Sequence, residues 1–170
     1  MDAEARRKMT LELLRTAETP LSAGTLAARF HVSRQIIVGD VALLRAAGED
    51  ILATPRGYMI RPAAPGLLRR IVCRHSAEEI GAELNAIVDQ GCSALDVIVE
   101  HPLYGQLTGP LQISNRYDVA QFLQRAAHAH AHPLSDLTGG IHLHTLACPD
   151  EDAYGRVLQA LRELRVLLED

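Results

Sequence analysis

Residues 33–60 read SRQIIVGDVALLRAAGEDILATPRGYMI, and this stretch decides the fold of the first third of the chain. Its first half carries apolar residues at Ile37, Val41 and Leu44, spaced by four and three as on one face of a helix. Ser33 is placed to cap the start of that helix. The pattern predicts a single amphipathic helix, followed by a structure of a different kind.

The second half of the stretch predicts a β-hairpin. Two short apolar segments, Ile51-Leu52-Ala53 and Tyr58-Met59-Ile60, flank Thr54-Pro55-Arg56-Gly57. Proline and glycine favour a tight turn at this point. The hairpin would place Arg56 at its tip, where a guanidinium can contact a phosphate or the minor groove.

Two further helices are expected before this stretch, over residues 3–16 and from a cap at Ser22 to about Phe30. Two helices joined by a tight turn have the geometry that enters a major groove. Residues 21–60 resemble the winged helix-turn-helix found ahead of several bacterial regulatory domains. The residues that carry this resemblance are Leu26-Ala27, Val32-Ser33-Arg34-Gln35, Asp40, Leu43-Leu44-Arg45, Gly48 and Ala53-Thr54-Pro55-Arg56-Gly57-Tyr58.

The same winged module precedes biotin-ligase-type enzymes, and a three-helix protein-interaction module is the alternative to DNA binding. Gly39 lies on the exposed face of the expected recognition helix, where relatives carry a longer polar side chain, and it removes a phosphate contact. We therefore expect weak, salt-sensitive binding by a monomer and specific binding by a dimer. The expected DNA-contacting residues are Ser33, Arg34, Gln35, Ile36, Arg56 and Tyr58.

Charge divides the chain into two parts. The net charge of −4 arises from +2 in residues 1–62 and −6 in residues 63–170, and seven of the eight histidines follow residue 62. Pro62-Ala63-Ala64-Pro65-Gly66 is the natural junction. We expect a DNA-binding domain over residues 1–62 and a second domain over residues 67–170. No apolar run reaches the ~20 residues of a membrane span, and three scattered cysteines do not indicate disulfides, so a cytoplasmic protein is expected.

The second part alternates strands and helices. This mixture favours an α+β fold, a sheet with its helices on one face. The expected strands are residues 67–75, 95–101, 109–114 and 140–148, and the expected helices are residues 76–89, 117–130 and 150–164.

Four side chains in this part form a candidate metal site. His142 and His144 are two residues apart on an expected strand, so both imidazoles point to the same face. His75 ends another strand, and Glu83 lies two turns into the helix that follows. Three imidazoles and one carboxylate suit zinc, nickel or another borderline divalent ion, with coordination positions left for an outside ligand. Glu79 is the rival carboxylate, although its spacing from Ser76 is typical of a capping box.

Other histidines have competing interpretations. A second group of potential metal ligands consists of His128, His130 and His132. Pro133 follows at once, which favours a solvated helix end instead. His101 ends a strand at a turn. It could support a metal ligand, contact an effector or stabilise the turn by a hydrogen bond.

Residues 67–168 resemble the domain named for three histidines, the 3H domain. The residues that carry the resemblance are Ile71-Val72-Cys73-Arg74-His75, Glu78-Glu79-Ile80, Asp96-Val97-Ile98-Val99-Glu100-His101-Pro102-Leu103-Tyr104-Gly105 and Gly139-Gly140-Ile141-His142-Leu143-His144-Thr145. In that family the domain follows a winged helix-turn-helix and has an HPr-like open-faced sandwich fold.

The resemblance implies a dimeric, niacin-responsive repressor of genes for niacin uptake or NAD synthesis, with nicotinate as corepressor. It also implies metal binding by His75, Glu83, His142 and His144, the four residues already selected. His101 and Tyr104 are candidate effector-binding residues. The alternatives are a repressor in which the metal itself is the signal and a small metal-dependent enzyme. We expect no enzyme, since the sequence shows neither a phosphate-binding loop nor a nucleophile motif.

Overall fold

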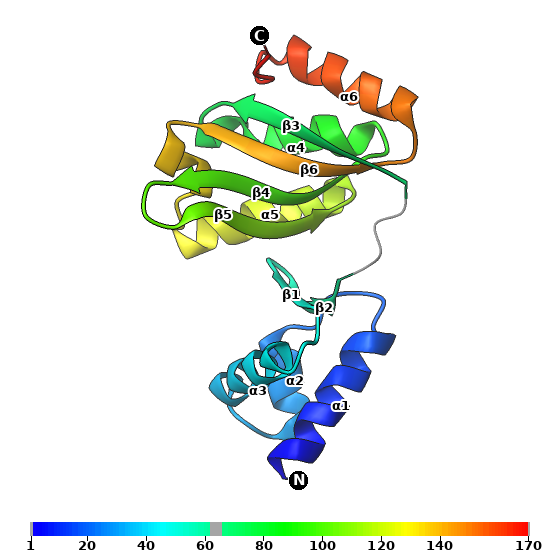
Figure 1. The fold of residues 1–170 in the computed structure, drawn as a ribbon, viewed down its shortest axis with the longest axis vertical. Helices are drawn as coiled ribbons and strands as arrows, with labels where there is room; N and C mark the ends of the chain where they lie inside the picture. Colours follow the sequence, from blue (N-terminus) through cyan, green and yellow to red (C-terminus); the bar gives the residue numbers. More distant parts are fainter. Residues whose placement is uncertain (1, 62–65, 170) are drawn as a thin grey trace. The chain divides into compact units, whose positions relative to one another are not determined.

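The computed structural model describes residues 2–61 and 66–169 of the chain. They fall into two compact units, residues 1–63 and 64–170, which are treated separately below (Figure 1). Four residues of the predicted junction, 62–65, lie outside the described residues. In the described ranges, no helix combines the length and the apolar character needed to cross a membrane.

The first unit is three helices followed by a hairpin. Its elements are α1 (Ala3–Thr16), α2 (Ala23–Phe30), α3 (Arg34–Ala46), β1 (Ile51–Thr54) and β2 (Gly57–Ile60). Each helix starts at a polar cap, because the side chains of Asp2, Ser22 and Ser33 accept the backbone N–H three residues further on. The helix-turn-helix and the hairpin therefore form where the sequence predicted them.

The helices of the first unit enclose an apolar core that includes Leu26, Ile37 and Val41. A partly buried ion pair joins α1 to α3, with Arg6 Nε 2.6 Å from Oδ2 of the buried Asp40. The hairpin is tied to the chain ahead of α2 by paired backbone hydrogen bonds of 2.8 Å between Leu21 and Tyr58. These contacts tie α3 to α1 and the hairpin to the chain ahead of α2.

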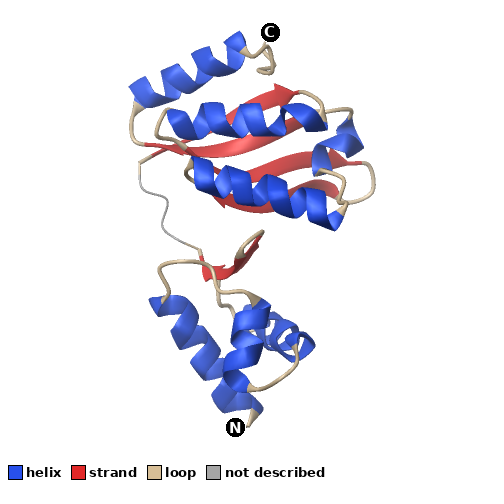
Figure 2. Cartoon of the chain, turned by 180° about the vertical axis from the view of Figure 1, so that it is seen from behind, coloured by secondary structure: helices blue, strands red, loops and turns tan. Residues whose placement is uncertain are grey.

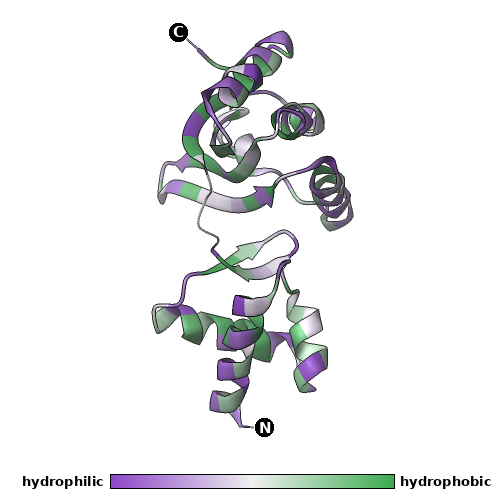
Figure 3. Ribbon diagram, turned by 90° about the vertical axis from the view of Figure 1, so that its right-hand side faces the viewer, coloured by the Kyte–Doolittle hydropathy of each residue, from purple (hydrophilic) through white to green (hydrophobic). Residues whose placement is uncertain are grey.

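The second unit is a four-stranded antiparallel sheet in the order β3-β6-β4-β5. Its elements are β3 (Leu67–Arg74), the 3₁₀ turn η1 (Ala77–Glu79), α4 (Ile80–Asp89), β4 (Ser93–His101), β5 (Gly105–Ile113), α5 (Arg116–Ala129), the 3₁₀ turn η2 (Leu134–Thr138), β6 (Ile141–Cys148) and α6 (Glu151–Glu163). The three α-helices cover one face of the sheet (Figures 2 and 3). The predicted α+β sandwich is confirmed.

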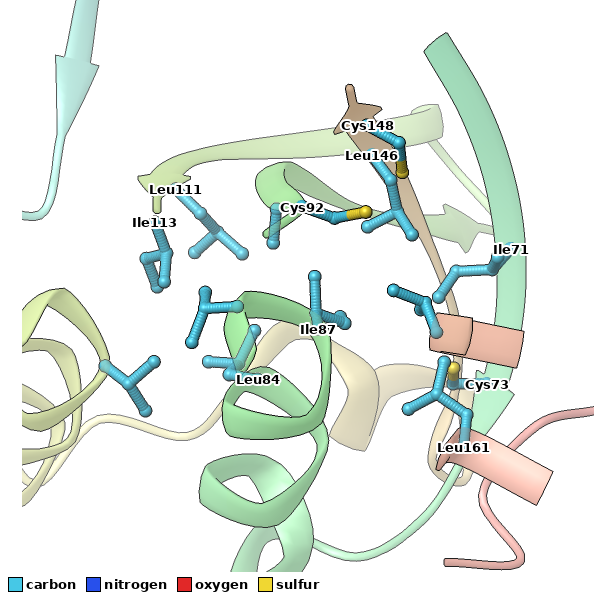
Figure 4. Close-up of a cluster of buried hydrophobic side chains, with 14 of the residues drawn as sticks. Ile71, Cys73, Leu84, Ile87, Cys92, Leu111, Ile113, Leu146, Cys148 and Leu161 are labelled. Carbon is cyan, nitrogen blue, oxygen red and sulfur yellow. The ribbon is translucent and has the colours of Figure 1, made fainter. Parts of the chain in front are cut away.

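The core of this unit lies between the sheet and the helices, and Figure 4 shows its larger side chains. The predicted strand began at Gly109 and lacked the first four residues of β5, because glycines and a proline in this strand obscured its periodicity. The prediction also omitted the chain after α6, where the N–H of Leu168 donates to Val72 O at 2.9 Å and extends the sheet beyond β3.

Candidate metal centre and DNA-binding surface

Strand β6 presents both of its histidines to the helix-covered face of the sheet. His142 and His144 are 2% and 3% exposed, whereas Ile141 between the turn and His142 is 39% exposed. The register places Cys73 of β3 directly opposite His142. Side chains that are directly opposite in an antiparallel pair share a face, so this part of the sheet gathers ligating groups.

Helix α4 brings Glu83 into this cluster. The carboxylate is buried, 1% exposed, and lies among all three imidazoles. Its Oε2 is 2.7 Å from Nε2 of His75, and its Oε1 is 3.0 Å from Nε2 of His142 and 3.3 Å from Nε2 of His144. The structure therefore brings together the four side chains that the sequence selected.

The other ring nitrogen of each histidine faces a backbone carbonyl. The distances from Nδ1 are 2.8 Å for His75 to Ser76 O, 2.9 Å for His142 to Gly140 O and 2.5 Å for His144 to Asp96 O. A carbonyl oxygen only accepts, so each Nδ1 carries a proton and donates it. In neutral rings, all three Nε2 lone pairs then point toward the Glu83 carboxylate.

In a buried site, imidazole lone pairs and a carboxylate that face one another repel unless a proton or a cation lies between them. Nε2 of His144 has no hydrogen-bond partner among the described residues. Burial is the largest single influence on the pKa of His144 and lowers it, but the interactions with Glu83 and Asp96 together outweigh burial and leave that pKa above its ordinary value. Burial has the opposite effect on Glu83 and raises its pKa, but the three histidines together outweigh burial and hold the pKa of Glu83 well below its ordinary value. The donor set thus fits a divalent cation.

Local backbone geometry fixes the orientation of these rings. Gly140, at φ +92°, accepts hydrogen bonds on its oxygen from both His142 Nδ1 and the N–H of His75. The strand register of β4 shifts next to Asp96, where the Asp96 carbonyl faces His144 and the Asp96 side chain accepts the N–H of Thr145 at 2.8 Å. Carbonyl partners of this kind hold metal-binding imidazoles in one tautomer.

Glu79, the rival carboxylate, completes the capping box instead. It accepts the N–H of Ser76 at 3.0 Å and starts the turn that leads into α4. Cys73 is a member of the cluster that sequence reasoning overlooked. The ligating atoms of Cys73, Glu83 and His142 all lie within 4.8 Å of one another. Burial, then the Glu83 charge, raises the pKa of the Cys73 thiol.

The remaining histidines lie elsewhere. Helix α5 ends at Ala129, so His132 does not share a helix face with His128, and its Nδ1 lies 3.4 Å from Asp136. His101 holds the turn after β4, since its Nδ1 accepts the N–H of Leu103 at 3.1 Å and that of Tyr104 at 3.3 Å. This agrees with the turn-stabilising interpretation. The rings of His101 and Tyr104 lie 5.0 Å apart.

The candidate DNA-contacting residues differ in how exposed their side chains are. Arg34, Gln35 and Ile36 are exposed on the first turn of α3, next to the cap residue Ser33. Arg56 lies in the two-residue turn between β1 and β2, as predicted. Tyr58 is partly buried against the core, with the Arg45 guanidinium 5.8 Å from its ring, so it supports the hairpin.

Comparison with known proteins identifies both units. Residues 6–59 match a family of HTH domains, and residues 68–170 match the 3H domain family. The chain is 39% identical to a protein of Thermotoga maritima named probable transcription repressor NiaR, covering 98% of this chain and 95% of the relative. It is 41% identical to the transcription repressor NadR of Bacillus subtilis, covering 97% of this chain and 94% of that relative. The chain therefore belongs to the family of transcription repressors in which an HTH domain precedes a 3H domain, the family that its motifs resemble.

Proposed function

We propose that this chain is a DNA-binding transcription repressor whose 3H domain binds a divalent transition metal ion, zinc or nickel. His75, Glu83, His142 and His144 would hold the ion. One observation carries the metal proposal: three imidazoles are fixed by backbone carbonyls so that each Nε2 faces one buried carboxylate. The two curated relatives, both named transcription repressors, support the repressor role.

DNA binding would use the first turn of α3 and the wing. Ser33 uses its hydroxyl oxygen to accept the N–H of Ile36 at 3.3 Å, which leaves its hydroxyl proton for a phosphate oxygen. Arg34 and Gln35, exposed on that turn, would contact base edges, and Arg56 would contact a phosphate. A homodimer would place two such helices in successive major grooves, roughly 34 Å apart.

Nicotinate is the proposed corepressor, and the regulated genes would serve niacin uptake or NAD synthesis. When bound, the ion would supply a Lewis-acidic position that a pyridine nitrogen can occupy. His101 and Tyr104, at the turn between β4 and β5, are the proposed effector contacts. The chain's own part is to orient the imidazoles and to keep the Glu83 carboxylate charged and away from water.

Calorimetry with Zn²⁺ or Ni²⁺ alone tests the metal site. We expect Glu83→Gln to weaken binding by more than about 100-fold, because it removes a direct ligand rather than an outer partner. Glu79→Gln is the matched control, since it changes a carboxylate one turn away that faces Ser76. Equal affinities for the two variants would rule out the assigned ligand set.

Fluorescence anisotropy tests the effector. The probe is a promoter fragment from a niacin-uptake or NAD-synthesis gene of the same genome, titrated with metal-loaded protein with and without nicotinate. We expect nicotinate to tighten binding and Gln35→Ala to weaken it. Full binding with metal alone, unchanged by nicotinate, would instead indicate a repressor that senses the ion itself.

A further inference from the structure

Cys73 lies in the cluster without belonging to the four proposed ligands. It is fully buried at the end of β3, directly opposite His142 and two residues before His75. Its sulfur, a Glu83 oxygen and a His142 ring nitrogen lie within 4.8 Å of one another. A tetrahedral ion bound at about 2.0 Å from nitrogen and 2.3 Å from sulfur holds these donor atoms about 3.5 Å apart, so side-chain rotations that draw the atoms together would bring them to one ion.

The other two cysteines have a different environment. Cys92 and Cys148 contact each other through their thiols in the apolar core. Cys148 pairs with Leu67 at the opposite end of β3 from Cys73 (Figure 4). Only the Cys73 thiol, among the three, faces a buried carboxylate and an imidazole.

We propose that the sulfur of Cys73 is a further ligand of the metal ion and selects thiophilic metals for this site. This inference rests on the proposed metal site. A second observation points to a ligand at the same place, because the fully buried Nε2 of His144 lacks a hydrogen-bond partner and faces Glu83.

The chemistry of the donor atoms determines which metal ions the proposed site would prefer. Imidazole and thiolate together favour zinc, cobalt and nickel over magnesium or manganese, which prefer oxygen ligands. The sulfur–metal bond forms as the thiol proton leaves to solvent, and neither partner changes oxidation state.

The test uses the full-length, metal-free protein titrated with Co²⁺ alone. A thiolate bound to Co²⁺ adds a sulfur-to-metal charge-transfer band in the near ultraviolet to the weaker visible d–d bands. We expect this band in the wild type, in Cys92→Ala and in Cys148→Ala. We expect Cys73→Ser to keep the d–d bands, to lose the charge-transfer band and to bind Co²⁺ more weakly by at least about tenfold, because a hydroxyl is a poorer ligand than a thiolate for this ion.

The outcomes separate the two proposals. Visible bands without a charge-transfer band in the wild type would overturn sulfur ligation and leave the metal site intact. A charge-transfer band that persists in Cys73→Ser, or disappears in Cys92→Ala, would also overturn it. No Co²⁺ bands in the wild type would overturn the metal site itself. The wild type and the other two cysteine variants decide the question even if Cys73→Ser fails to fold.

Discussion

Substituting Gly140 by alanine should damage the proposed metal centre without replacing any of its ligands. Gly140 has φ +92°, and a Cβ added there would lie 2.5 Å from the carbonyl oxygen of His75. The unfavourable backbone conformation costs about 1–3 kcal/mol. Moving the backbone away also weakens the bond from His142 Nδ1 to Gly140 O, worth about 1 kcal/mol. We therefore expect a loss of about 2–4 kcal/mol in unfolding free energy.

The same shift would misalign His75 and His142. Metal affinity should therefore fall roughly 10–100-fold, the usual effect of losing a hydrogen-bond partner that orients a metal ligand. Gly139→Ala is the matched control. Gly139 also has positive φ, +59°, but a Cβ there meets nothing within 4 Å, so about 1–2 kcal/mol of backbone strain is expected and metal affinity should hold. Urea unfolding and calorimetry with Zn²⁺ measure both effects. Equal metal affinity in the two variants would show that the Gly140 backbone does not position the metal-binding side chains.

Two further predictions concern protons and DNA. Burial lowers the pKa of His75 and His144, but Glu83 raises both above the ordinary 6.5, so the metal-free folded protein holds protons that the unfolded chain releases. Their stabilisation is complete below pH 6.5 and is lost as pH rises through the raised values. Zn²⁺ binding at pH 7 should then release protons, and calorimetric heats that are identical in two non-coordinating buffers of different ionisation enthalpy would contradict this. Gly39→Arg should tighten DNA binding and steepen the salt dependence of log K by about 0.9, because Gly39 is exposed on α3 with open space around it. Gly155→Arg is the control in the same anisotropy titration, because Gly155 also has open space around it, on α6. Equal salt slopes of log K for the two variants would mean that DNA does not bind at this face of α3.

Most of the helices and strands could be predicted from local sequence. Ser22, Ser33 and Asp150 act as the caps that their types and positions indicate. Period-two alternation places His142 and His144 on one face, and that needs no knowledge of the rest of the fold. Prediction failed where glycine and proline interrupt a pattern, as in β5, and where a segment is ordered only by a distant strand, as with the chain after α6.

Local sequence patterns were enough to predict the two-part organisation, the order of the elements and four candidate metal-binding residues. Only the tertiary structure placed Glu83 between three imidazoles and brought Cys73 opposite His142. It also supplied the carbonyls of Ser76, Asp96 and Gly140 that orient the rings. The physical reason is that strand register and helix docking result from contacts between residues far apart in the chain. Backbone carbonyls, moreover, are present in every residue and leave no mark in an amino-acid sequence.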